Sequence, residues 1–157
     1  MKKITLLFTL FIAAFGFSQN LPFDFSSANQ LMSGGDGAVI TIVQDDANDV
    51  LQIVGAQQAW DHAAITFEDN IDLSDDANNT ITFKIKVVNG TGNGVHLLKF
   101  EGGVAGPATA EMAYTTTGTE WQTVTVDFGA GLGNYSKMVL FVDSGDANAG
   151  VSDTYLV

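Results

Sequence analysis

The stretch TITFKIKVV (residues 80–88) decides the fold class of this chain of 157 residues. Apolar and polar side chains alternate along it, with Ile81, Phe83, Ile85 and Val87 on one side and Thr80, Thr82, Lys84 and Lys86 on the other. Because successive side chains of a strand point to opposite faces, this alternation predicts a half-buried β-strand. The segment WQTVTVDF (residues 121–128) follows the same pattern and places Val124, Val126 and Phe128 in the core.

Eight more short segments look like strands, which makes about ten in all. They are FDF near residue 24, VITIV (39–43), VLQIV (50–54), AAITF (63–67), VHLLKF (95–100), AEMAYT (110–115), KMVLFV (137–142) and the terminal TYLV. No window of a dozen residues has helical periodicity, and Gly, Asn or Asp stands at many junctions. The pattern predicts that residues 21–157 form one all-β domain, a two-sheet antiparallel jelly-roll sandwich.

The first eighteen residues are typical of a signal peptide. Two lysines are followed by an apolar run from Ile4 to Phe15 and by the small-residue ending Gly16-Phe17-Ser18. The apolar run is too short to span a bilayer, and no second run follows it, so we expect no membrane span in the mature protein. We therefore divide the chain into a signal peptide (1–18) and a secreted or cell-surface β-sandwich module (19–157).

Composition excludes several kinds of function. Residues 19–157 keep four lysines, no arginine and all eighteen acids, a formal net charge of −14. Nucleic acids are bound by basic surfaces, so a nucleic-acid partner is excluded. The chain has no cysteine, which removes disulfides and thiolate metal sites.

No catalytic motif is present in the sequence. There is no GxSxG elbow, and His62 and His96 form no zinc-binding pattern. The glycines between Gly90 and Gly94 indicate a hairpin loop and not a phosphate loop, because a strand follows them. Nothing singles out two of the eighteen acids as a glycosidase pair. The sequence therefore favours a protein that is not an enzyme.

Trp60 is the main candidate for ligand binding. It lies in the loop-like stretch GAQQAWDHA, beside Gln57, Gln58, Asp61 and His62. An aromatic face complements the apolar face of a sugar ring, and these neighbours offer hydrogen bonds to hydroxyl groups. A Trp that caps the edge of the sandwich explains the same residue equally well.

Trp121 is a second aromatic candidate, with a different balance of evidence. Alternation within its strand places it on the outer side with Thr123 and Thr125. Sugar stacking and a framework role both stay open at this position.

Three lysines form a third candidate group. If residues 89–94 close a symmetric hairpin, Lys84 lies opposite Lys99 with Lys86 on the same face, a patch suited to a carboxylated or sulfated glycan. We favour the alternative that the lysines form cross-strand ion pairs with Glu101, Glu111 or nearby Asp residues, because the net charge of −14 repels anionic ligands.

Several segments in this order resemble one family of domains. They are LPFDF, QAWDHAAITFEDNIDLS, TITFKIKV, VHLLKFE, TEWQTVTVDF and YSKMVLFVD. Together they are similar to the secreted carbohydrate-binding-module-like jelly rolls of marine Bacteroidetes, which belong to the galactose-binding-like superfamily. The resemblance covers nearly all of residues 21–157.

The resemblance carries further expectations. It implies a polysaccharide or oligosaccharide partner, and a covalently linked downstream enzyme or sorting domain that is not present in this sequence. It also implies a structural calcium ion at Asp24 and Asp46, and a framework role for Trp121, which we favour over sugar stacking. In the family, the last strand runs on into acidic residues, so the domain is expected to be truncated after Val157.

Two functions follow from these observations. The first is a non-catalytic extracellular glycan-binding module that targets a polysaccharide, or brings an attached enzyme to it. The alternative is a structural spacer or adhesin sandwich without a sugar site. A binding module should expose Trp60 or Trp121 beside polar side chains, whereas a spacer should bury both.

The signal peptide yields a direct prediction. The mature secreted protein should begin at Gln19, because the small-residue ending before it is the kind that signal peptidase cuts. The intact mass of the secreted protein measures this. Secreted protein that still carries Met1 would contradict the assignment.

Overall fold

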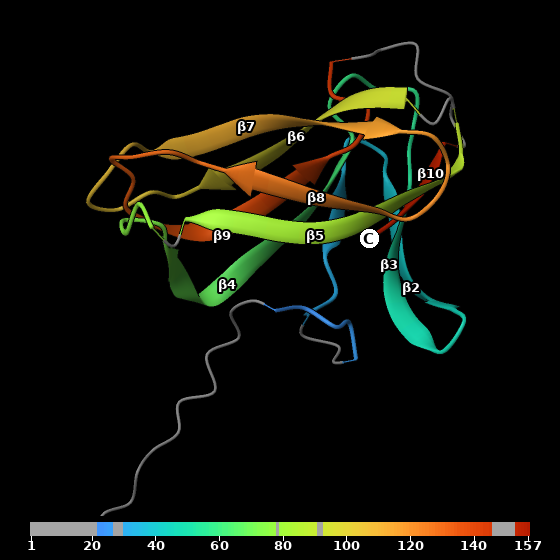
Figure 1. The fold of residues 1–157 in the computed structure, drawn as a ribbon, viewed down its shortest axis with the longest axis horizontal. Helices are drawn as coiled ribbons and strands as arrows, with labels where there is room; N and C mark the ends of the chain where they lie inside the picture. Colours follow the sequence, from blue (N-terminus) through green and yellow to red (C-terminus); the bar gives the residue numbers. More distant parts are fainter. Residues whose placement is uncertain (1–21, 27–29, 78, 91–92, 146–152) are drawn as a thin grey trace, which may run out of the picture.

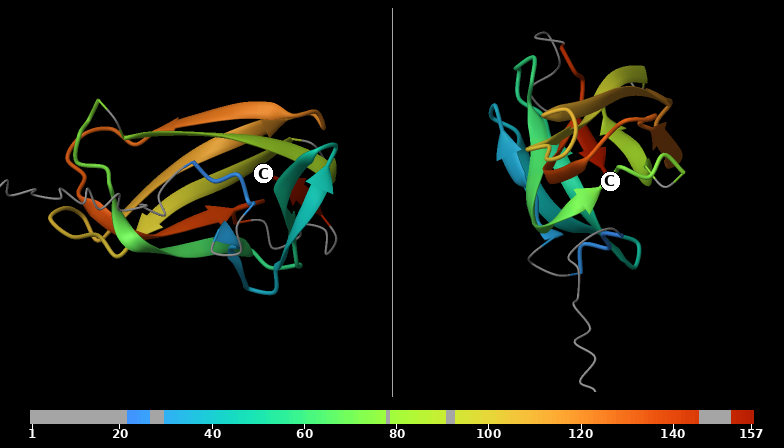
Figure 2. Two further views of the ribbon diagram at one scale, coloured as in Figure 1. Left: turned by 90° about the horizontal axis from the view of Figure 1, so that it is seen from below. Right: turned by 90° about the vertical axis from the view of Figure 1, so that its left-hand side faces the viewer.

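Two five-stranded antiparallel sheets face each other in the computed structural model, which describes residues 22–26, 30–77, 79–90, 93–145 and 153–157 (Figure 1). The first sheet has the order β1 (Ser33–Gly35), β4 (His62–Asp72), β9 (Asn134–Phe141), β6 (Asn93–Glu101) and β7 (Thr109–Thr117). The second has the order β2 (Val39–Asp45), β3 (Asn48–Val54), β10 (Thr154–Leu156), β5 (Thr80–Asn89) and β8 (Gln122–Asp127). The predicted antiparallel sandwich is confirmed. Figure 2 shows the two layers from two further directions.

The core lies between the sheets, where the alternation predicts it. Five of the six predicted core residues are buried: Ile81, Ile85, Val124, Val126 and Phe128. The sixth, Phe83, is half-buried and packs edge-on against Tyr114 with ring centroids 5.2 Å apart. β5 pairs with β8 so that Ile81 is opposite Val126 and Phe83 is opposite Val124. The apolar faces of both strands therefore point to the same side.

Nine of the ten predicted strands are present, and the FDF segment is the exception. Pro22–Ser26 is not a strand, because the Asp24 carboxylate accepts hydrogen bonds from both the amide and the hydroxyl of Ser26 and Phe25 adopts a left-handed backbone (φ 55°). Side-chain bonds of this kind compete with a strand ladder. The tenth strand is instead β1, three residues long.

The loop around residues 90–94 does not close a hairpin, so that prediction is wrong. β5 and β6 belong to opposite sheets, and the loop crosses between the layers. Lys84 is opposite Thr123 in the second sheet, whereas Lys99 is opposite Glu111 and Val139 in the first. The predicted lysine patch is therefore divided between two faces. Glycine-rich turn chemistry is local and does not distinguish a hairpin from a crossover.

The predicted signal peptide lies outside the described residues. Among the residues that are described, none forms a helix long and apolar enough to cross a membrane.

A buried histidine joins the two sheets at one end. His96 of β6 is fully buried and stacks on Tyr114 at 4.9 Å. Its Nδ1 accepts the amide of Asp143 at 3.1 Å, so its Nε2 carries the proton and donates to Thr116 at 2.9 Å. Tyr155 of β10 packs edge-on against the same ring and donates its hydroxyl to the Asp143 carboxylate. These hydrogen bonds require a neutral imidazole, because a protonated Nδ1 could not accept the Asp143 amide.

His96 should make the fold sensitive to acid. Burial lowers the His96 pKa from 6.5 to about 4, so below pH 6.5 the unfolded chain takes up a proton that the folded chain refuses. The free energy of unfolding should therefore fall by about 3 kcal/mol between pH 6.5 and pH 4, at 1.36 kcal/mol per pKa unit. Urea unfolding of the protein and of a His96→Gln variant across this range measures it. The variant should lose most of this drop whatever its stability at neutral pH, and an unchanged slope would contradict the assignment.

Candidate functional site

Trp60 stands exposed at the end of the loop between β3 and β4. Its side chain is 52% exposed, a large fraction for a residue of this size. The indole packs edge-on against Phe141 at the end of β9, with ring centroids 6.0 Å apart and planes at 84°. Such edge-to-face contacts fix the orientation of a ring. The indole is thus held by one aromatic contact while about half of it faces solvent.

A buried aspartate and two backbone hydrogen bonds hold the conformation of the loop that carries Trp60. Asp61 is 2% exposed, and its Oδ2 accepts the amide of Ala56 at 2.6 Å. Burial raises the pKa of this carboxyl group. The Gln58 amide donates to the Ala56 carbonyl at 2.7 Å, and the Gly145 amide donates to the Ala59 carbonyl at 2.7 Å. Asp61 therefore supports the loop from the interior, and its carboxylate does not face a ligand in solvent.

His62 continues the aromatic surface onto β4. Its Nδ1 lies 2.8 Å from the Trp60 carbonyl oxygen, and its ring lies 5.1 Å from that of Phe141. The imidazole occupies the space above Gly35 of β1, where a Cβ atom would come within 2.2 Å of the ring. Glycine at position 35 is thus what allows His62 to lie flat across the edge of the sheet.

The strand register extends this surface across the first sheet. His62 is opposite Phe141, Phe141 is opposite Leu97 of β6, and Leu97 is opposite Ala113 of β7. Residues directly opposite each other lie on the same face of a sheet. This row, together with Trp60, forms what we call the aromatic face: Trp60, His62, Phe141 and Leu97.

An ion cluster lies further along the same side of the first sheet. Glu101 contacts Lys99 at 3.0 Å and Lys137 at 2.9 Å. Lys137 precedes Phe141 by four residues of β9, which corresponds to about 13 Å along a strand. Hydrogen bonds from Lys137 and Lys99 lower the pKa of Glu101. Lys99 thus forms an ion pair with Glu101, but within β6 and not across strands as expected.

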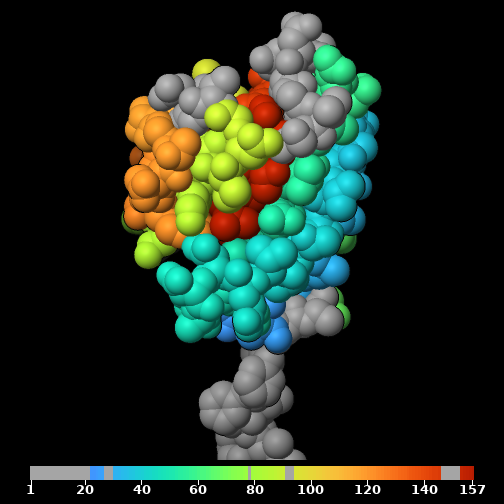
Figure 3. Space-filling view, turned by 90° about the vertical axis from the view of Figure 1, so that its right-hand side faces the viewer, coloured from blue at the N-terminus to red at the C-terminus, as the bar shows by residue number. Residues whose placement is uncertain are grey.

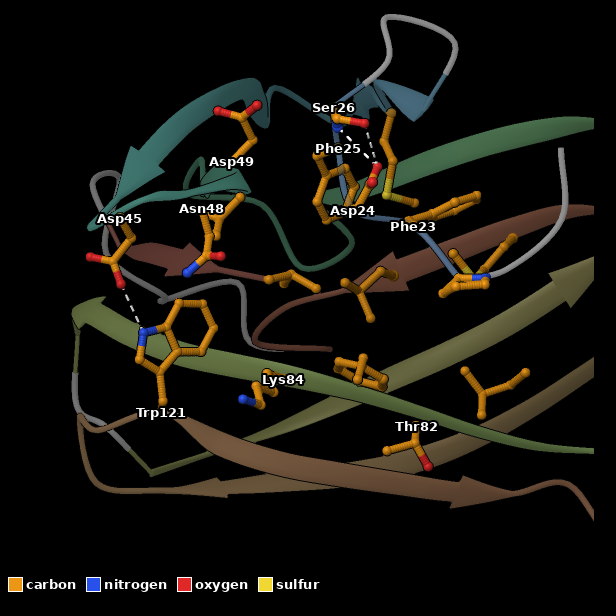
Figure 4. Close-up of a pocket in the computed structure, with 18 of the residues that line it drawn as sticks. Phe23, Asp24, Phe25, Ser26, Asp45, Asn48, Asp49, Thr82, Lys84 and Trp121 are labelled. Atoms are coloured by element: carbon orange, nitrogen blue, oxygen red, sulfur yellow. Dashed lines mark hydrogen bonds between the residues drawn. The ribbon is translucent and has the colours of Figure 1, made fainter.

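Trp121, Lys84 and Lys86 lie on the second sheet, away from the aromatic face (Figure 4). Trp121 is half-buried, and its Nε1 donates to Asp45 at 2.8 Å. Lys86 pairs with the same carboxylate at 3.6 Å, and its Nζ lies 5.8 Å from the indole centre. Lys84 is exposed. The bonds of Trp121 suit the framework role that the resemblance implies.

The two residues predicted to bind calcium, Asp24 and Asp46, border the same cavity, but no other observation supports a calcium site there. Hydrogen bonds from Ser26 to the Asp24 carboxylate (Figure 4) lower its pKa. Among the described residues, no three His, Asp or Glu side chains come close enough together to hold a metal ion. The calcium ion at Asp24 and Asp46 stays a prediction.

The sequence did not single out Phe141 and Leu97 as site residues. Phe141 belongs to KMVLFV, where Lys137, Val139 and Phe141 share the outer side, but the buried Val139 interrupts the polar alternation. Leu97 lies in VHLLKF, where His96 and not an apolar residue takes the inward place. In both segments the alternation is too weak to show that Phe141 and Leu97 face outward, because apolar residues occur on both sides of each strand.

Solved structures with the same fold are carbohydrate-binding modules or contain related domains. The CBM22-1 xylan-binding domain of Xyn10C from Paenibacillus barcinonensis superposes with a TM-score of 0.51 at 18% identity, covering 81% of each chain. The family 11 module of Clostridium thermocellum, in complex with a β-1,3-1,4-mixed-linked tetrasaccharide, gives 0.56 at 15% identity over 86% of this chain and 89% of the other. An exo-β-agarase gives 0.59 at 13% identity over 90% of this chain and 24% of the enzyme.

These similarities establish the jelly-roll fold. No protein-family model matches the chain, and no curated protein is significantly similar to it in sequence.

Proposed function

We propose that this protein is a non-catalytic, extracellular glycan-binding module whose binding surface is the aromatic face. The exposure of Trp60 next to His62 and Phe141 carries the proposal. An indole that is half in water and is held in a fixed orientation offers the flat apolar surface on which a sugar ring stacks. The fold shared with xylan-binding and mixed-linkage glucan-binding modules supports it.

The surroundings of Trp60 suit a sugar chain. The indole offers an apolar face for stacking, and the His62 ring contacts the Trp60 backbone. Gln58, two residues before Trp60 in the same loop, has an exposed side chain. Polar groups next to an aromatic platform fix the orientation of the bound ligand. The ion cluster, further along the sheet, presents the charged groups of Lys99 and Glu101 to hydroxyls of a longer chain.

We infer that the preferred ligand is a neutral polysaccharide. The domain carries a formal charge of −14 after residue 18, which opposes the approach of a sulfated or carboxylated chain. Lys99 and Lys137 share the carboxylate of Glu101, so the ion cluster has a formal charge of only +1 against −14 for the whole domain. Neutral xylans and β-glucans fit these charges better.

The carboxyl groups near the aromatic face do not favour a hydrolytic role. Asp61 has a raised pKa but is buried beneath the loop, where it cannot reach a bound sugar. Glycoside hydrolysis needs one carboxylic acid with a raised pKa to protonate the leaving oxygen. The pKa of Glu101 is lowered by its two lysines, which makes it a poor proton donor. We therefore propose that the module brings an attached enzyme, or the cell surface, to a polysaccharide. The CBM22-1 module of Clostridium thermocellum Xyn10B stands beside a GH10 module in this way.

Replacing Trp60 should remove binding without unfolding the domain. For Trp60→Ala we expect affinity for a retained neutral polysaccharide to fall at least about tenfold, because exposed aromatic anchors dominate binding energy. The melting temperature should change little, since the side chain is 52% exposed. Affinity gel electrophoresis against xylan, mixed-linkage β-glucan, agarose and a sulfated galactan measures retention.

The matched control is Val88→Ala, because Val88 is also 52% exposed but lies on β5 of the other sheet. It should retain wild-type binding. Trp121→Ala should instead reduce stability by about 3 kcal/mol, the usual cost of truncating a packed aromatic residue. Wild-type retention by Trp60→Ala, or loss of binding by a folded Trp121→Ala, would contradict the assignment.

A further inference from the structure

Three acidic residues gather at the end of the sandwich that carries the Trp60 loop. Asp61 precedes β4, Asp143 follows β9 and Asp153 precedes β10, which lies between β3 and β5 (Figure 3, red between teal and yellow-green). Burial raises the pKa of the Tyr155 hydroxyl, and the negative charges of all three residues raise it further. All three therefore lie within electrostatic reach of one phenol. We call them the acidic end cluster.

One oxygen of the acidic end cluster is buried without a partner. Asp61 is only 2% exposed, and its Oδ2 accepts the Ala56 amide. Its Oδ1 is also buried, and it has no hydrogen-bond partner among the described residues. A buried carboxylate oxygen is costly unless a positive or hydrogen-bonding group meets it. The Oδ1 atom of Asp61 therefore points to a bound group that the described chain does not supply.

The lysines do not neutralise the acidic end cluster. Residues 19–157 contain four lysines and no arginine. Three of these lysines form ion pairs with Glu101 or Asp45, and the fourth borders the cavity in Figure 4. His62 is a basic neighbour of Asp61, but its Nδ1 already contacts the Trp60 carbonyl. The described side chains thus leave this end of the domain with an excess of negative charge.

Oxygen atoms from separate segments border one space beside Gly55. A Cβ atom on Gly55 would lie 2.9 Å from Asp61 Oδ2 and 3.5 Å from the Asp153 carbonyl oxygen, so glycine leaves this space open. The Asp153 carbonyl accepts the Gly55 amide at 2.8 Å, and a carbonyl oxygen can accept a second partner. Burial raises the pKa of Asp61, and the charge of Asp143 raises it further. The two carboxylates are therefore close enough to repel each other.

We propose that the acidic end cluster binds one Ca²⁺ ion, held by the carboxylates of Asp61 and Asp143 and by the backbone carbonyl of Asp153. Calcium takes roughly six to eight oxygen ligands in a flexible arrangement, and backbone carbonyls and water supply many of them. Such a site needs no third carboxylate, which suits a cluster in which no three described acidic side chains meet. Mg²⁺ fits less well, because it requires a near-ideal octahedron.

The ion would connect the two segments that position Trp60. Asp61 directly follows Trp60, and Asp143 precedes Gly145 by two residues, whose amide bonds the Ala59 carbonyl at 2.7 Å. A Ca²⁺ ion between Asp61 and Asp143 would join the same two segments a second time. This consequence for glycan binding rests on the proposed function, whereas the calcium site itself does not.

The experiment measures calcium binding to the protein after treatment with EDTA. Titration calorimetry gives the affinity, and thermal unfolding is followed at neutral pH with added CaCl₂ or MgCl₂. Asp61→Asn and Asp143→Asn remove one charge each and keep an oxygen for the bonds that these residues accept. The matched control is Asp46→Asn, which removes an acid of the other predicted calcium site. Asp46 has a left-handed backbone (φ 55°), which asparagine tolerates.

Calcium should raise the melting temperature of the unchanged protein and of Asp46→Asn by about 4 °C or more, and magnesium should raise it less. Asp61→Asn and Asp143→Asn should bind calcium at least about tenfold more weakly. Without calcium, Asp61→Asn should melt no lower than the unchanged protein, because it removes a buried charge that nothing meets. Its loss of calcium binding then cannot be ascribed to unfolding.

An unchanged melting temperature of the unchanged protein in calcium would overturn the proposal. A calcium-induced shift that Asp61→Asn keeps and Asp46→Asn abolishes would also overturn it, because the ion would then lie at the other predicted site. Trp60→Ala should bind calcium as the unchanged protein does. Failure of the glycan-binding proposal and failure of the calcium site are therefore observed separately.

Discussion

The second sheet depends on three residues at its centre. Thr154, Tyr155 and Leu156 form β10, which joins the β2–β3 pair to the β5–β8 pair. Tyr155 and Leu156 are both buried, and the Tyr155 hydroxyl bonds Asp143 next to the last strand of the first sheet. β10 thus holds the halves of one sheet together and ties that sheet to the other. Its shortness is also why the core beside it is open.

The same contacts position the aromatic face. The Asp143 amide bonds buried His96, and two residues later the Gly145 amide bonds the carbonyl of Ala59. Ala59 directly precedes Trp60, so the backbone from Asp143 to Gly145 connects the buried His96 contacts to the exposed indole. Protonation of His96 would break its bond to the Asp143 amide, and it should weaken both the packing between the sheets and the support of the Trp60 loop. The acid sensitivity of the fold and the geometry of the site therefore have one origin.

Alternation in the sequence predicted most of this fold, because most of the strands bury one face and expose the other. It located β5 and β8 and their core residues. It failed for the loop at residues 90–94 and for FDF, where the conformation does not depend on which face of a strand is buried. The pairing of Lys84 depends on whether residues 90–94 turn back or cross to the other sheet, which is a property of the whole sandwich. FDF has the apolar pattern of a strand, yet the bonds between Asp24 and Ser26 turn the backbone there.

The candidate site was predictable in part. Trp60 was found from its loop and its polar neighbours, but the role of Asp61 was not, since burial beneath the loop is a tertiary feature. Phe141 and Leu97 join Trp60 only because β9 and β6 are neighbours in the first sheet. Pairing between strands distant in the sequence cannot be read from either strand alone.

The two indole N–H groups provide the most direct test of where a glycan binds. Trp60 and Trp121 are the only tryptophans in the sequence, so a ¹⁵N-labelled sample gives two indole signals, one from each candidate surface. On titration with xylohexaose or a mixed-linkage β-glucan tetrasaccharide, the Trp60 signal should shift saturably. The Trp121 signal, held by its bond to Asp45, should stay in place. A saturable shift of Trp121 with an unmoved Trp60 would contradict the account and place the sugar at the second sheet.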